Sequence, residues 1–129
     1  MTSQGSPRGR FERAIRGGHV WHADVAVREL GGHLSLSDAL SLVMLYVRAD
    51  DPRALRAVYR WVRRARDEHA LSAAEGDLLT AALLGLGTRF GDAAVETLQT
   101  ACRRLGLSRP TVPGPVPRSH LGRSSMESL

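Results

Sequence analysis

The sequence predicts an all-α protein with five main helices, and three observations support this fold class. Apolar residues recur at helical spacing along most of residues 19–105. Residues that favour helix starts precede these stretches, and glycines that favour helix ends follow them. No stretch reads as a convincing strand, because none combines alternating apolar residues with strand-forming composition. We therefore expect one helical domain at 9–107.

The N-terminal region is expected to contribute little structure before the first main helix. Residues 1–8 are small and polar and contain Pro7, which predicts a disordered tail. A short turn of helix at 10–16 is expected to end at the glycine pair 17–18. The first main helix then covers about 19–30, and a second glycine pair closes it.

Four further helices follow, each with a recognisable start or stop. Ser35 and Asp38 form a pair that resembles a capping box, and Ser72 with Glu75 forms a complete one. Pro52 falls at the first position of the third main helix, where proline is favoured. The expected ranges are 35–49, 52–69, 72–87 and 92–105.

The C-terminal residues 108–129 are predicted to form a disordered tail that contains Pro, Ser and Arg. This composition builds no core of its own and favours extended, polyproline-like structure. The spacing of Pro110 and Pro113 would also suit an aromatic groove on a partner, although a plain tail is the favoured interpretation.

A weak internal repeat relates the two halves of the helical region. Leu34 corresponds to Leu71, and the arginine pair 63–64 corresponds to the pair 103–104. Helices 35–49 and 72–87 are apolar nearly all round, so both are expected to be central. Two helical hairpins preceded by one helix resemble a short tetratricopeptide- or HEAT-like stack. A compact bundle would give the same pattern.

The positive charge is concentrated at the ends of the chain. All 18 basic residues are arginines, and the net charge is +5. Within residues 18–107, eleven arginines balance eleven acidic residues, so the helical region is neutral. We attribute the abundance of arginine to a GC-rich genome. This distribution weakens an argument for nucleic-acid binding from net charge alone.

Helix 52–69 carries the densest arginine cluster. A wheel at 100° per residue places the predicted buried stripe around Leu55, with Val58, Tyr59 and Val62 inside it. Arg66 projects into this stripe and must extend along the surface or meet an acid. Trp61 falls at the margin, beside the basic face. Five arginines occupy that face: Arg53, Arg56, Arg60, Arg63 and Arg64.

Three interpretations of this basic face remain open: a solvated or internally paired surface, a protein-binding surface, and a nucleic-acid surface. The leading functional prediction is a non-enzymatic protein-interaction or regulatory module, because an exposed Trp beside Arg is typical of interface anchors. The alternative is a nucleic-acid-binding accessory protein that uses helix 52–69 and the basic tails. The candidate interaction residues are Arg53, Arg56, Arg60, Trp61, Arg63, Arg64, Arg103 and Arg104.

The sequence offers no catalytic, cofactor-binding or metal-binding motif, so we predict that the protein is not an enzyme. His19 and His22 supply at most half a zinc site, with only His33 or Asp24 as speculative third ligands. Cys102 lies in an apolar helical series and is expected to be a core residue.

The N-terminus lacks the apolar segment of a signal peptide, and the longest apolar run, 42–47, is too short to span a bilayer. We therefore expect a cytoplasmic protein that does not enter the membrane.

Residues 11–105 resemble a group of short, uncharacterised all-helical proteins of GC-rich actinobacteria. The shared features are REL at the end of the first main helix, LSLSDALSL, the DDPR turn and the RW pair. The resemblance implies a helical fold and a bacterial cytoplasm. It implies no activity and no site residues.

Overall fold

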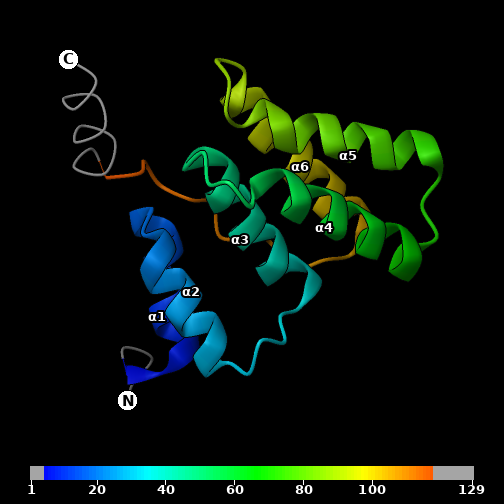
Figure 1. Ribbon diagram of the computed structural model, residues 1–129. Helices are drawn as coiled ribbons and strands as arrows, with labels where there is room; N and C mark the ends of the chain where they lie inside the picture. Colours follow the sequence, from blue (N-terminus) through cyan, green and yellow to red (C-terminus); the bar gives the residue numbers. More distant parts are fainter. Residues whose placement is uncertain (1–4, 118–129) are drawn as a thin grey trace.

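The computed structural model describes residues 5–117 and shows an all-helical fold (Figure 1). No strand occurs among the described residues, as the sequence predicts. The described part contains six helices rather than five, because the N-terminal turn is a full helix. The helices are α1 (Pro7–Gly17), α2 (Val20–Glu29), α3 (Leu36–Arg48), α4 (Ala54–His69), α5 (Ala73–Gly85) and α6 (Gly91–Leu105).

Helix α1 corrects the prediction of a disordered segment up to residue 8. The Ser6 hydroxyl accepts a hydrogen bond from the Gly9 amide at 2.9 Å, and Pro7 occupies the first helical position. Both are standard helix-start signals, so the sequence contained the information. Phe11 and Ile15 are fully buried, and this burial stabilises the helix. The predicted stop is confirmed, since Gly18 adopts a left-handed conformation with φ of 71°.

The other helices agree closely with the predicted ranges, and side-chain caps mark the starts of α3 and α5. Helix α4 begins at Ala54, so Pro52 lies in the turn before the helix and not at the predicted first position. Ser35 accepts a hydrogen bond from the Asp38 amide at 3.1 Å. Ser72 and Glu75 form the complete capping box, with both reciprocal hydrogen bonds present. None of the helices within residues 5–117 is both long enough and apolar enough to cross a membrane.

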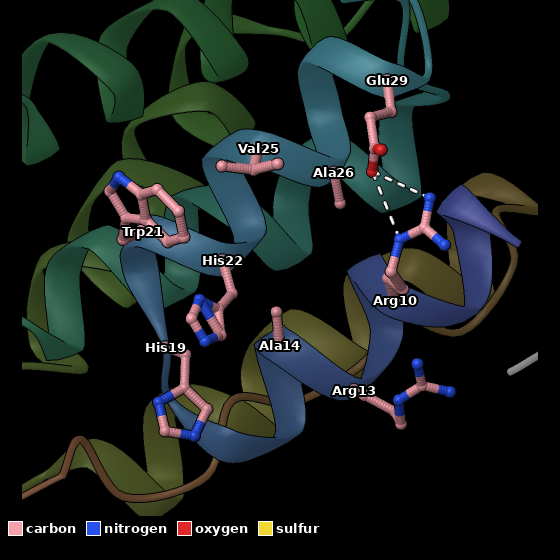
Figure 2. A pocket seen from close by; sticks show the side chains of 9 residues that line it. All are labelled: Arg10, Arg13, Ala14, His19, Trp21, His22, Val25, Ala26 and Glu29. Atoms are coloured by element: carbon pink, nitrogen blue, oxygen red, sulfur yellow. Dashed lines mark hydrogen bonds and ion pairs between the residues drawn. The ribbon is translucent and has the colours of Figure 1, made fainter. Parts of the chain in front are cut away.

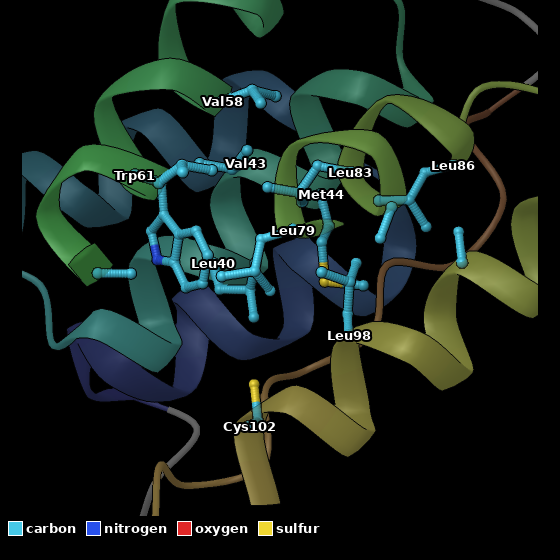
Figure 3. Packing of buried hydrophobic residues seen from close by; sticks show 14 of the residues in the cluster. Leu40, Val43, Met44, Val58, Trp61, Leu79, Leu83, Leu86, Leu98 and Cys102 are labelled. Carbon is cyan, nitrogen blue, oxygen red and sulfur yellow. The ribbon is translucent and has the colours of Figure 1, made fainter. Parts of the chain in front are cut away.

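Two apolar clusters hold the helices together, and α3 belongs to both. The hairpin of α1 and α2 packs around Phe11, Ile15 and Ala26, and Leu45 of α3 joins that cluster. The larger cluster lies among α3, α4, α5 and α6, with Leu40 and Trp61 close together in Figure 3. Helix α3 is therefore central, as the sequence predicts.

The prediction that α5 is also central is wrong, because only one side of this helix is buried. Leu79 and Leu83 point into the core. Leu78 is 58% exposed and Leu84 is 40% exposed on the other side. An apolar composition all round reports how much surface could be buried, whereas the position of α5 at the outside of the fold decides how much is buried.

Residues 107–117 form an extended segment that packs back across the helices, and we call it the strap. It runs from the end of α6 past α3 to α1 (Figure 1). Pro113 is fully buried, and Pro110 is buried as well. The prediction of a disordered tail from residue 108 is therefore not what the structure describes for 108–117. The predicted tail beyond residue 117 lies outside the described residues.

The strap is ordered because it packs against α1 and α3. Its own proline-rich composition could not form a core. Proline has a fixed φ and no amide to satisfy, so docking it costs little entropy and few hydrogen bonds. The Thr111 amide donates to the Ser41 hydroxyl at 2.8 Å, and the Gly114 amide donates to the Ile15 carbonyl at 3.3 Å. A Cβ at Gly114 would lie 2.1 Å from the Arg16 carbonyl oxygen, so only glycine fits there.

Candidate functional site

Helix α4 buries part of the predicted stripe, but its buried face is turned away from Leu55 and toward Trp61. The buried residues are Val58, Trp61, Val62 and Ala65. Leu55 and Tyr59, predicted to be central in the stripe, are 53% and 56% exposed. At 100° per residue, the centre of the buried residues lies about 70° from Leu55, on the side of Trp61. Arg66, predicted within the stripe, is consequently exposed and lies against Gly76.

Trp61 explains the rotation and corrects the prediction of an exposed interface anchor. Its side chain is 3% exposed within the main core. The indole Nε1 donates a hydrogen bond to the Leu36 carbonyl at 2.8 Å, so burying the polar nitrogen carries no penalty. The largest apolar side chain of α4 therefore turns inward, and smaller apolar residues are left outside.

The rotation places a groove of about 500 Å³ between α3 and α4, which we call the arginine groove. Its apolar part includes Leu42, Val43 and Ala57. No acidic residue lines it within the described part of the chain. Arginines from one side of α4 supply its charge: Arg53, Arg56, Arg60 and Arg64.

Arg53, near the N-terminal end of α4, is held by a polar network that joins α2, α3 and the turn before α4. Its Nε lies 2.9 Å from Asp51 Oδ1, and its Nη2 lies 2.8 Å from Asp24 Oδ2. The guanidinium also lies over the Tyr46 ring, at 4.4 Å from its centroid. The hydrogen bond from Arg53 keeps the pKa of Asp51 below its ordinary value. This charge is therefore fixed in place.

Tyr46 completes the network from α3. Its hydroxyl donates to Asp24 Oδ1 at 2.6 Å. Burial, and then this hydrogen bond, raises the pKa of Tyr46, so the hydroxyl stays protonated and keeps donating. The network fastens the α1–α2 hairpin to α3 and makes one wall of the arginine groove rigid.

Arg64 is fixed as well, three turns further along α4. Its Nε lies 2.7 Å from Glu68 Oε2, and its Nη1 donates to the Leu34 carbonyl at 2.9 Å. The second bond ties α4 to the linker between α2 and α3. Sequence spacing predicts a contact with Glu68 at i,i+4, but the contact with Leu34 depends on the tertiary fold.

Arg56 and Arg60 lie between these two fixed arginines, and their guanidinium groups remain available. Both side chains are exposed. Among the described residues, neither makes a hydrogen bond or an ion pair. They stand four residues apart, which places them about one helical turn from each other on the same side of α4. The groove thus has two anchored cations at its ends and two free cations between them.

The remaining predicted surface residues do not join this groove. Arg63 faces a second groove of about 890 Å³ between α4 and α5, together with Asp67 and Asp77. Arg104 lines a third groove of about 410 Å³ between α5 and α6. Arg103 is exposed on α6, where its Nη2 lies 3.1 Å from Thr100 Oγ1. The structure therefore splits the predicted single surface into separate faces.

The two histidines lie beside a cavity of about 340 Å³ between α1 and α2 (Figure 2). The ring centroids of His19 and His22 are 5.4 Å apart. Both carboxylate oxygens of Asp24, a speculative third ligand, are engaged by Tyr46 and Arg53 instead. No group of three or more metal-binding side chains occurs in residues 5–117 that could hold an ion.

Cys102 is buried in the main core, as the sequence predicts. Burial raises the pKa of its thiol, which keeps the sulfur protonated and poorly nucleophilic. Its position favours a packing role.

Comparison with known proteins adds no relative to this description. The chain matches no protein-family model, no curated protein and no solved structure at a significant level. The resemblance to actinobacterial helical proteins therefore stays a prediction.

Proposed function

We propose that this chain is a non-enzymatic protein-interaction module whose arginine groove binds an acidic, amphipathic segment of a partner protein. One observation carries the proposal: a groove with an apolar floor is lined by four arginines and, among the described residues, by no acid. An amphipathic helix could place apolar side chains on Leu42 and Val43 and carboxylates against Arg56 and Arg60. Carboxylates match the planar donor pattern of guanidinium groups.

The same groove is less suited to a nucleic-acid backbone. Phosphates gain nothing from an apolar floor, and they require unpaired cations along their path. The arginines of α1 are already engaged, since Arg8 pairs with Asp38 and Arg10 pairs with Glu29 at 3.0 Å. These ion pairs reduce the charge that the N-terminal region would contribute to the alternative function.

The test uses the full chain and a fluorescent helical peptide of about three heptads, with Leu on one face and Glu on the other. We expect binding by fluorescence anisotropy, and at least tenfold weaker binding after Arg56→Glu combined with Arg60→Glu. A tenfold loss corresponds to about 1.4 kcal/mol, a modest amount for two lost charge-assisted contacts.

The matched control is Arg28→Glu combined with Arg103→Glu, which changes the net charge by the same amount at exposed sites on α2 and α6. This pair should leave peptide binding nearly unchanged. If both double variants lost the same peptide affinity, net charge alone would explain the effect. That result would contradict binding in the arginine groove. Tighter binding of a labelled DNA or RNA duplex than of the peptide at physiological salt would favour the nucleic-acid alternative.

A further inference from the structure

The outer side of α5 exposes an apolar surface that no described part of the chain covers. Leu78 and Leu84 are 58% and 40% exposed, and Ala81 lies exposed between them. Tyr59 of α4, which is 56% exposed, lines the same groove as Ala81 and Leu84. We call these four residues the α5 patch. Exposed apolar side chains grouped in this way are typical of a contact site.

The charges beside the α5 patch are balanced, unlike those of the arginine groove. Arg63 and Arg66 share the α4–α5 groove with Asp67 and Asp77. The groove on the other side of α5 brings Arg104 together with two glutamates, Glu75 and Glu96. A surface that carries both signs around an apolar centre can face its own copy, whereas Arg56 and Arg60 of the arginine groove, unpaired within the described chain, would repel theirs.

The internal repeat shows what the α5 patch would do in a longer stack. The shift that relates Leu34 to Leu71 also relates Met44 to Ala81. Met44 is fully buried in the main core, and Figure 3 shows it beside Leu98 of α6. The corresponding surface of α5 is left open.

The two ends of the helical arrangement differ in polarity. Terminal units of helical stacks need polar outer faces to stay soluble. Helix α1 exposes Arg13 and Arg16 at one end, whereas α5 exposes leucines. The α5 end therefore has an incomplete polar cap, because Leu78, Ala81 and Leu84 interrupt its exposed charges.

We propose that the α5 patch is the surface through which two copies of this chain associate about a two-fold axis. In a two-fold contact, the α5 patch of each copy covers the α5 patch of the other. Both patches are then buried, so the assembly stops at a dimer. This proposal is independent of the arginine groove, which lies on the opposite side of α4.

Sedimentation equilibrium of the full chain, from about 1 to about 200 µM, tests the proposal in the micromolar range typical of a modest interface. We expect twice the monomer mass at the upper concentrations. Leu78→Glu and Leu84→Glu should each weaken association at least tenfold, while the conservative Leu78→Met should retain it. Trp21→Glu is the matched control, because Trp21 is 66% exposed on α2, away from the α5 patch.

Circular dichroism melts of each variant verify that the monomer remains folded, which is expected because the replaced side chains are already exposed. A wild-type chain that stays monomeric throughout the range would overturn the proposal. So would Leu78→Glu and Leu84→Glu variants that remain dimeric.

Discussion

The two sides of α4 carry similar residue types but present different surfaces. Toward α3, the helix exposes arginines over an apolar floor with no acid among the described lining residues. Toward α5, it exposes Tyr59 and further arginines, but Asp67 and Asp77 stand beside them. The first surface suits a partner of opposite charge, and the second suits a surface like itself.

Counting arginines along a helix therefore does not identify a binding face. What matters is which neighbouring helix supplies acids and which arginines are already used. Arg53 and Arg64 serve the fold through Asp24, Asp51 and the Leu34 carbonyl. Only the tertiary arrangement distinguishes them from Arg56 and Arg60.

The largest expected effect compares the inward Trp61 with the outward Tyr59 on α4. Trp61→Ala should lower the free energy of unfolding by about 3–5 kcal/mol, because it opens a cavity and leaves the Leu36 carbonyl without its donor. Tyr59→Ala should cost less than about 1 kcal/mol, as expected for an exposed site. Urea denaturation measures both, and equal losses would contradict the assigned rotation of α4.

An intermediate effect is expected where the strap covers α1 and α3, in contrast to the uncovered α5. Gly114→Ala should destabilise the protein by about 2 kcal/mol, because the added methyl group collides with the Arg16 carbonyl. Gly5→Ala is the control, since nothing lies within 4 Å of its Cβ position. Limited proteolysis should also cut Gly114→Ala faster within the strap. A variant as stable and resistant as Gly5→Ala would show that the strap is not docked.

The smallest expected effect separates the two surfaces by their response to salt. Raising the NaCl concentration from about 0.05 to about 0.5 M should weaken peptide binding in the arginine groove about tenfold, because salt screens exposed charges. Self-association through the α5 patch should change less than about twofold, because apolar burial drives it. Anisotropy and sedimentation measure the two equilibria on the same samples. If peptide binding and self-association depended equally on salt, the proposed difference between the arginine groove and the α5 patch would be wrong.

Sequence patterns located the helices well because the responsible interactions are local. The Ser35 cap and the Ser72–Glu75 capping box each close within four residues, so the pattern and the structure agree. Ser6 and Pro7 form the same kind of signal, which the interpretation of residues 1–8 as a tail overlooked. Tyr46 was missed as a site residue, and Asp24 was considered only as a metal ligand, because their contact joins separate helices.

Sequence patterns were sufficient to predict the all-α class, most helix ends, the burial of Cys102 and the neutrality of residues 18–107. Tertiary contacts set the orientation of α4, the docking of the strap and the exposure of α5. Helix formation depends on hydrogen bonds between residues a few positions apart, which the sequence shows directly. Burial depends on which distant surfaces meet, so an apolar residue such as Leu78 can face solvent and proline-rich residues can join a core.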